Sequence, residues 1–191
     1  MTKVYFVRHA QSDWRSGSDR ERGLTAEGQE DRNVVLEFLR NKQVDAFYCS
    51  PYRRSIDTIQ EAAEYYGQPI QTDERLRERK TVPGGNTREL FRKRWADFDR
   101  HEPGGESLRS VQERNIAALT DILEQNTGKT IVIGTHSTAL STILNYYDPG
   151  YGCNDFLRMI DWMPFVVELD FDGTRFLSKT EHVHVEKIFK P

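Results

Sequence analysis

Short apolar runs alternate along the chain with amphipathic segments, and this alternation is the first guide to the fold. The apolar runs predict strands at 2–8, 44–49, 70–72 and 130–134. The run at 130–134 is apolar throughout, which is typical of a strand covered on both faces of a sheet. Further along, 165–169 and 175–177 predict a hairpin around Asp172-Gly173. The pattern therefore predicts a sheet that lies between other layers.

Amphipathic segments with recognisable ends predict the helices, at 25–41, 51–66, 107–125 and from 137 onward. Thr25 is a capping residue at the start of the first helix. Ser50-Pro51 combines a capping hydroxyl with a proline at the first helical position, and Gly67 is suited to a C-terminal cap. Strands that alternate with helices favour an α/β fold, here a three-layer α/β/α sandwich with a mainly parallel central sheet.

The 191 residues suit a single domain over 1–191, within which 79–105 differs in composition. This segment has a Pro-Gly-Gly sequence near each end and a charged amphipathic stretch between them. Between positions 75 and 100 the chain has nine basic and four acidic residues. We expect a lid-like insertion that steers an anionic substrate or, alternatively, a solvated helix face. The apolar residues expected to pack it are Leu90, Phe91, Trp95 and Phe98.

The overall composition argues against nucleic-acid binding, a membrane helix and secretion. The net charge is -3, so the chain is no general polycation for nucleic acid. No apolar run approaches the roughly 20 residues that a membrane helix needs, and no secretory signal pattern is present at the amino end. Two cysteines are too few for a disulfide framework, which favours a cytoplasmic location. The sequence gives no indication of the oligomeric state.

Candidate catalytic residues follow the predicted strands. Arg8-His9 ends the first strand, and His136 follows the strand at 130–134. Arg53 and Arg54 lie near the start of the helix after Ser50-Pro51. Ligands of α/β sheets bind at the carboxyl ends of the strands, so we expect these residues to meet. An imidazole can attack phosphorus and a guanidinium can hold two phosphate oxygens, so the set predicts phosphoryl transfer.

The same residues carry a family resemblance that extends over most of the chain. The segments in question are 6–12, 24–28, 50–58, 103–107 and 134–137. In this order they resemble the histidine phosphatase superfamily, which contains cofactor-dependent phosphoglycerate mutases and many phosphatases. The resemblance implies that His9 is the nucleophile and forms a phosphohistidine. It also implies that Arg8, Arg54 and the catalytic His136 complete a phosphate pocket without a metal ion.

The resemblance implies a general acid as well. Leu76-Arg77-Glu78 matches the context in which the family places this glutamate, so Glu78 is expected to protonate the leaving group. The alternative is that Glu78 forms a salt bridge with neighbouring arginines. The chain departs from the common family pattern at 10–12 and at Arg15, where asparagine is usual. Ser12 and Arg15 are therefore expected as substituted phosphate contacts, with a solvated charge as the alternative for Arg15.

Four other side chains are expected to have roles outside the catalytic set. Arg53 is expected on the surface, and Glu106 is expected to cap the helix that follows it. His182 and His184 share one face of a possible strand, but no third ligand is evident and no metal site is predicted.

The predicted function is a metal-independent phosphomonoesterase that acts on a small phosphorylated metabolite. Glu78 and Thr135 are only 57 positions apart, since 135 − 78 = 57, which favours an open pocket and hydrolysis by water. The alternative is a phosphoglycerate mutase, which would need 2,3-bisphosphoglycerate as a cofactor; no cofactor is otherwise expected. A further alternative from another class is a non-catalytic module that binds a phosphorylated ligand or a protein.

Overall fold

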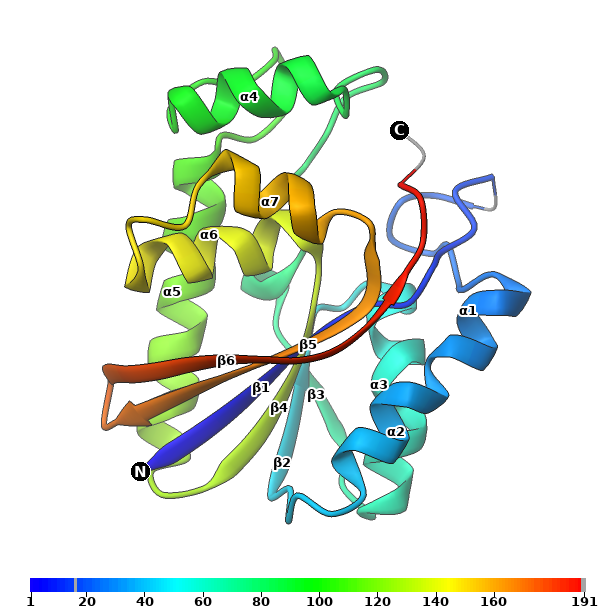
Figure 1. Ribbon diagram of the computed structural model, residues 1–191, viewed down its shortest axis with the longest axis vertical. Helices are drawn as coiled ribbons and strands as arrows, with labels where there is room; N and C mark the ends of the chain where they lie inside the picture. The colour runs from blue at the N-terminus through cyan, green and yellow to red at the C-terminus, as the bar shows by residue number, and fades with distance from the viewer. Residues whose placement is uncertain (16, 190–191) are drawn as a thin grey trace.

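The computed structural model describes residues 1–15 and 17–189, and its centre is a six-stranded sheet (Figure 1). The strand order is β3-β2-β4-β1-β5-β6. The first four of these are mutually parallel, whereas β5 pairs antiparallel with β1 and β6 pairs antiparallel with β5. The strands are β1 (Thr2–Arg8), β2 (Ala46–Cys49), β3 (Ile70–Thr72), β4 (Thr130–Thr135), β5 (Trp162–Asp172) and β6 (Arg175–Glu186).

Helices cover both faces of this sheet, which confirms the predicted α/β class. One face packs against α2 and α3 through an apolar cluster that includes Leu39 and Ile59. The other face packs against α5 and α6, with Leu119 and Ile143 in the core. The helices are α1 (Ala26–Asp31), α2 (Asn33–Leu39), α3 (Arg53–Tyr65), α4 (Arg88–Ala96), α5 (Leu108–Gln125), α6 (Ser137–Tyr147) and α7 (Cys153–Met159), with a 3-10 turn at Glu74–Leu76.

The strand register brings the candidate residues to one edge of the sheet. Arg8 pairs with Thr135 across β1 and β4, and Cys49 pairs with Gly134 across β2 and β4. The residues that follow these pairs are His9, Ser50 and His136. Parallel register therefore places them at the same carboxyl edge, as the sequence predicts.

Two predicted helix boundaries are wrong. The helix expected over 25–41 is divided at Arg32, whose side chain donates to the Asp57 carbonyl and the Glu61 carboxylate and so ties the break to α3. The helix expected at Pro51 begins at Arg53, because Tyr52 keeps an extended backbone. Ser50 does not cap the helix; its Oγ lies 2.7 Å from His136 Nε2.

The segment 79–105 contains α4, which lies above α7 in Figure 1. Phe91 of α4 packs against Phe156 of α7 and against Ile160, which follows α7, in a small separate core, and Trp95 packs beside them. Of the four residues predicted to pack this segment, Phe91 and Trp95 lie in this core and Phe98 contacts Trp95. The sequence did not predict α7. The role of this segment as a lid remains a prediction.

Within the described part of the chain, no helix combines the length and apolar character needed to cross a membrane.

Candidate active site

A cavity of about 660 Å³ opens at the carboxyl edge of the sheet. Its lining includes Arg8, His9 and Arg54, together with Glu78. His136 lies behind His9, with 5.2 Å between the two ring centroids. The structure therefore brings together residues that come from β1, α3, the segment after the 3-10 turn, and the end of β4.

The hydrogen bonds of His9 define its tautomer. Its Nδ1 lies 2.7 Å from the carbonyl oxygen of Ala10, which can only accept, so Nδ1 carries the proton. Nε2 accepts a hydrogen bond from Arg54 Nε at 3.2 Å, so Nε2 bears the lone pair. Burial, and then the charges of Arg54 and Arg8, hold the pKa of His9 well below its ordinary value of 6.5. His9 is thus a neutral imidazole at neutral pH, with its proton on Nδ1.

Arg54 is buried and is oriented by the loop that precedes α1. Its Nη1 donates to the backbone carbonyl of Asp19, and its Nη2 lies 3.3 Å from the Asp19 carboxylate. Burial, and then the charge of Arg22, lower the pKa of Arg54 to about 10. The guanidinium remains cationic at neutral pH and faces both His9 and the cavity.

Arg8 joins the end of β1 to the end of α7. Its Nη1 donates to the carbonyl oxygens of Met159, Ile160 and Trp162 at 2.5, 2.9 and 2.9 Å. Its Nε is buried without a partner among the described residues. Burial lowers the pKa of Arg8 to about 10, so the group is still charged at neutral pH. A donor left unpaired beside a cavity is suited to an anionic ligand.

His136 is fully buried and is held by one side chain. Its Nε2 lies 2.7 Å from Ser50 Oγ, and its Nδ1 is unpaired among the described residues. Burial and the nearby charge of Arg54 place the pKa of His136 well below 6.5. Phosphate in the cavity would favour protonation of this ring, because an anion stabilises a cationic partner.

Glu78 lies at the amino end of α6. Its Oε2 accepts from Thr138 N at 3.0 Å and from Ser137 Oγ at 3.2 Å, and its Oε1 accepts from Ala139 N at 3.1 Å. These bonds satisfy free N–H groups at the start of the helix, and they hold the carboxyl group at the wall of the cavity. The alternative expected for Glu78 was a salt bridge with neighbouring arginines. In the structure, Glu106 makes such a salt bridge instead.

Glu106 does not cap the following helix, so that expectation is wrong. Ser107 caps it by accepting from Ser110 N. Glu106 instead pairs with Arg77 and Arg114, each at 2.8 Å. Burial alone would raise the pKa of Glu106, but hydrogen bonds from these two arginines lower it to about 2. Arg114 also donates to the Glu78 carbonyl at 3.1 Å, so this network positions the backbone of the proposed acid.

The two less usual phosphate candidates lie further out. Ser12 lines the cavity and forms an isolated bridge with Leu24. The Arg15 side chain also lines the cavity, but it is 73% exposed and pairs with Asp13 at 3.2 Å. Arg53, expected on the surface, is exposed and pairs with Asp57.

Arg22 is a residue of the candidate site that the sequence did not predict. Its Nη2 pairs with Asp19 at 2.9 Å, and its Nε is buried without a partner among the described residues. It lines the cavity, and its charge contributes to the low pKa values of His9 and His136. Only the density of charged residues in this loop could have drawn attention to it, because the loop has no periodic pattern.

No group of three or more potential metal ligands occurs among residues 1–15 and 17–189. His182 Nε2 lies 2.8 Å from Glu168, and the ring of His184 stacks on Trp162 with 4.0 Å between centroids. These two histidines therefore have structural partners.

The sequence over residues 4–180 matches the histidine phosphatase superfamily, branch 1. The chain belongs to this family, which confirms the resemblance drawn from its motifs.

Two curated relatives indicate the range of activities in this family. Phosphoserine phosphatase 1 of Hydrogenobacter thermophilus is 28% identical over 155 residues, which cover 73% of each chain. The probable phosphoglycerate mutase GpmB of Salmonella choleraesuis is 28% identical over 159 residues, which cover 76% of this chain and 74% of the relative. The relatives thus include both a phosphatase and a probable mutase.

A solved structure supports the fold independently. YhfR of Bacillus stearothermophilus superposes with a TM-score of 0.75 and 24% identity, over 93% of this chain and 95% of that chain. At this level of identity the likeness establishes the shared fold.

Proposed function

We propose that the protein is a metal-independent phosphomonoesterase that works through a phosphohistidine at His9 and acts on a small phosphorylated metabolite. The observation that carries the proposal is the state of His9. Its ring is neutral, its Nε2 lone pair lies beside the cavity, and two buried guanidinium groups flank it. A neutral imidazole between fixed cations is suited to attack a phosphate group.

In the first half of the reaction, the substrate phosphate replaces His9 as the partner of Arg54 Nε. Nε2 then attacks phosphorus, and the bond from phosphorus to the ester oxygen breaks. Glu78 gives its proton to that oxygen, so the leaving group departs as a neutral alcohol. Arg8, Arg54 and Arg22 stabilise the charge on the non-bridging oxygens, and the hydrogen bond from Nδ1 to the Ala10 carbonyl stabilises the positive ring.

In the second half, water attacks the phosphohistidine. Glu78, now a carboxylate, takes a proton from the water, and the bond from phosphorus to Nε2 breaks. Inorganic phosphate leaves and His9 returns to its neutral form. His136, oriented by Ser50, is proposed to donate to a phosphate oxygen, and Ser12 and Arg15 to contact the phosphate from the outer side. No metal or organic cofactor takes part in this scheme.

A cytoplasmic location is part of the proposal. It is supported by the two cysteines, Cys49 and Cys153, which are both free thiols.

The test is hydrolysis of p-nitrophenyl phosphate in the presence of EDTA. Wild type should be active and His9→Ala inactive, while His101→Ala, which changes an exposed histidine outside the cavity, should match wild type. Loss of activity in EDTA, or full activity of His9→Ala, would contradict the proposal.

Two further assays separate the alternatives. Phosphoglycerate isomerisation that depends on added 2,3-bisphosphoglycerate, with little hydrolysis, would identify a mutase. Binding of phosphate without any phosphoryl transfer would identify a non-catalytic module.

A further inference from the structure

The cavity is much larger than a phosphate group needs. Its volume of about 660 Å³ lies within the roughly 300–1,000 Å³ that is typical of sites for drug-sized ligands. The part beside His9 accounts for the phosphate, so the remainder is available to the ester group of the substrate. The residues in that remainder should therefore report the chemistry of the ester group.

The lining of the cavity includes polar residues such as Arg79, Thr81 and Asn86, and also a set of apolar residues that we call the apolar wall. We use this name for the residues Trp14, Phe91, Phe156, Ile160, Ile188 and Phe189. They come from four separate places: the loop after β1, helix α4, the α7 region and the C-terminal segment. Phe91, Phe156 and Ile160 are buried and form a packed base, and the ring of Phe189 lies 6.0 Å from that of Phe91.

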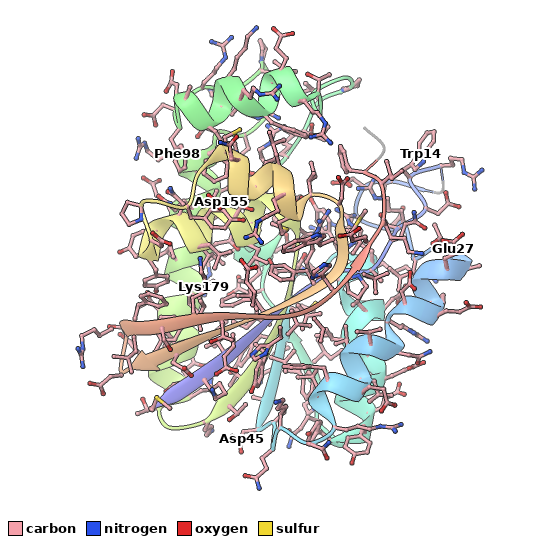
Figure 2. The ribbon with its side chains drawn as sticks, viewed as in Figure 1. Trp14, Glu27, Asp45, Phe98, Asp155 and Lys179 are labelled. Atoms are coloured by element: carbon pink, nitrogen blue, oxygen red, sulfur yellow. The ribbon has the colours of Figure 1, made fainter. Side chains whose placement is uncertain are left out.

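Two members of the apolar wall are strongly exposed. Trp14 is 60% exposed and Ile188 is 81% exposed, although both line the cavity. In Figure 2, Trp14 projects at the upper right of the molecule, on the side where the described chain ends. Large apolar side chains that are left open at the mouth of a cavity gain free energy when an apolar ligand covers them.

The C-terminal segment is held in place beside the cavity. Lys187 pairs with Glu27 at 2.9 Å and with Asp31 at 3.0 Å on α1. On the other side, the backbone N–H of Phe189 donates to the Asp161 carboxylate at 2.7 Å. These contacts fix the backbone on both sides of Ile188, so its exposure at the cavity is a feature of the fold.

The acidic side chains of the cavity wall outside Glu78 already have cationic partners. Asp13 pairs with Arg15, and Asp19 pairs with Arg22 and Arg54. Glu27 pairs with Lys187. A substrate with an ammonium group, such as phosphoserine, would have to displace one of these pairs. An uncharged ester group displaces none of them.

We infer that the substrate is a phosphomonoester whose ester group is uncharged and apolar, and that the apolar wall binds this group. The inference rests on the proposed function, because the phosphate is taken to bind beside His9. It predicts that affinity increases with the apolar surface of the ester group, whereas charged and hydroxylated esters of similar size bind more weakly.

The first experiment measures binding without turnover. The dissociation constants of ethyl-, butyl- and hexylphosphonate are compared by calorimetry on the wild-type protein. We expect up to about fourfold tighter binding per added methylene, the equivalent of about 0.8 kcal/mol each. Equal affinity along the series would overturn the inference, whatever the catalytic activity proves to be.

The second experiment measures turnover of alkyl phosphates that have comparable leaving groups. We expect kcat/KM for hexyl phosphate to exceed that for phosphoserine and for glycerol 3-phosphate by at least about tenfold. Preference for either polar ester would contradict the inference while leaving the phosphohistidine mechanism intact. Absence of hydrolysis with any ester would contradict the proposed function, and the phosphonate series would still decide the inference.

Exposed residues of the apolar wall allow a test that does not threaten folding. Ile188→Ser and Trp14→Ala should each weaken hexylphosphonate binding by about threefold to tenfold and leave ethylphosphonate binding unchanged. The matched controls are Leu177→Ser and Tyr146→Ala, which remove exposed apolar side chains outside the cavity. Equal effects of the cavity variants and the controls would overturn the assignment of the wall.

Discussion

The two ends of the cavity are built in different ways. The inner end, around His9, uses residues at the carboxyl ends of paired strands, and its cationic and titratable groups are almost completely buried. The outer end uses a loop, α4, α7 and the C-terminal segment, and two of its apolar residues are largely exposed. The inner end therefore has a geometry fixed by the sheet, which suits chemistry common to a family. The outer end depends on short connecting segments, which suits recognition of a particular substrate.

The difference between the ends predicts different consequences of mutation. Changes at the inner end should lower the rate of the chemical steps, because they alter the groups that act on the reacting atoms. Changes at the outer end should alter the choice of substrate, because they alter only the surface that contacts the ester group.

The largest expected effect is that of His9→Ala. Removal of the proposed nucleophile should lower kcat by at least about 10³-fold for every ester, because the covalent intermediate of the proposed mechanism forms on this ring. Steady-state kinetics with p-nitrophenyl phosphate and hexyl phosphate would measure this, with a thermal unfolding curve as the control for folding. Loss of activity toward one ester alone would contradict the division between the two ends.

Neighbouring arginines allow a paired test of the inner end. Arg54→Ala should lower kcat by about 10²–10³-fold, because it removes a buried cation that faces His9. Arg53→Ala should change kcat by less than about threefold, because Arg53 is exposed and pairs with Asp57 at the surface. Comparable losses in both variants would show that the buried position of Arg54 has no special role.

Glu78→Gln should have a smaller and selective effect. The amide cannot protonate the leaving oxygen, so kcat for alkyl phosphates should fall by about 10²-fold. Turnover of p-nitrophenyl phosphate should fall much less, because p-nitrophenolate leaves without a proton. A measurement of kcat against leaving-group pKa would test this, and equal slowing of all esters would count against Glu78 as the acid.

The smallest expected effect concerns stability and pH. The pKa of His9 in the folded protein lies below the value of about 6.5 expected in the unfolded chain. Below pH 6.5 the unfolded chain therefore binds a proton that the folded protein does not, and stability falls as pH decreases. Above pH 6.5 the ring is neutral in both states and contributes no pH dependence.

Urea unfolding between pH 5 and 7.5 would measure this contribution. Below pH 6.5, His9→Ala should flatten the dependence by up to about 1.4 kcal/mol per pH unit relative to wild type. Ile188→Ser, at the outer end, should keep the wild-type slope. If stability depended on pH identically in His9→Ala and wild type, this would contradict the buried, neutral state of His9.

Much of the inner end could be predicted because its signals are local. Arg8-His9 and His136 each follow an apolar strand directly, and parallel pairing then brings them together without further information. The central strands and α5 were also predictable, since their apolar periodicity is clear over several residues.

Other features depend on contacts between distant parts of the chain. Glu106 appeared to be a helix cap, but its partners Arg77 and Arg114 are set by tertiary structure. The start of α3 was misplaced because Ser50 contacts His136 instead of capping the helix. Arg22 and the parts of the apolar wall outside α4 escaped prediction because their positions come from loops, a seven-residue helix and the C-terminal segment, none of which has a periodic pattern.

The central claim is that His9 becomes phosphorylated during turnover. The most direct measurement is a rapid mix of enzyme with a good phosphomonoester, an alkaline quench that preserves phosphohistidine, and mass spectrometry of the peptides. The account predicts a phosphoryl group on the peptide that contains His9, formed and lost at rates consistent with turnover. Turnover without a phosphorylated peptide, or a phosphoryl group on His136 instead, would contradict it.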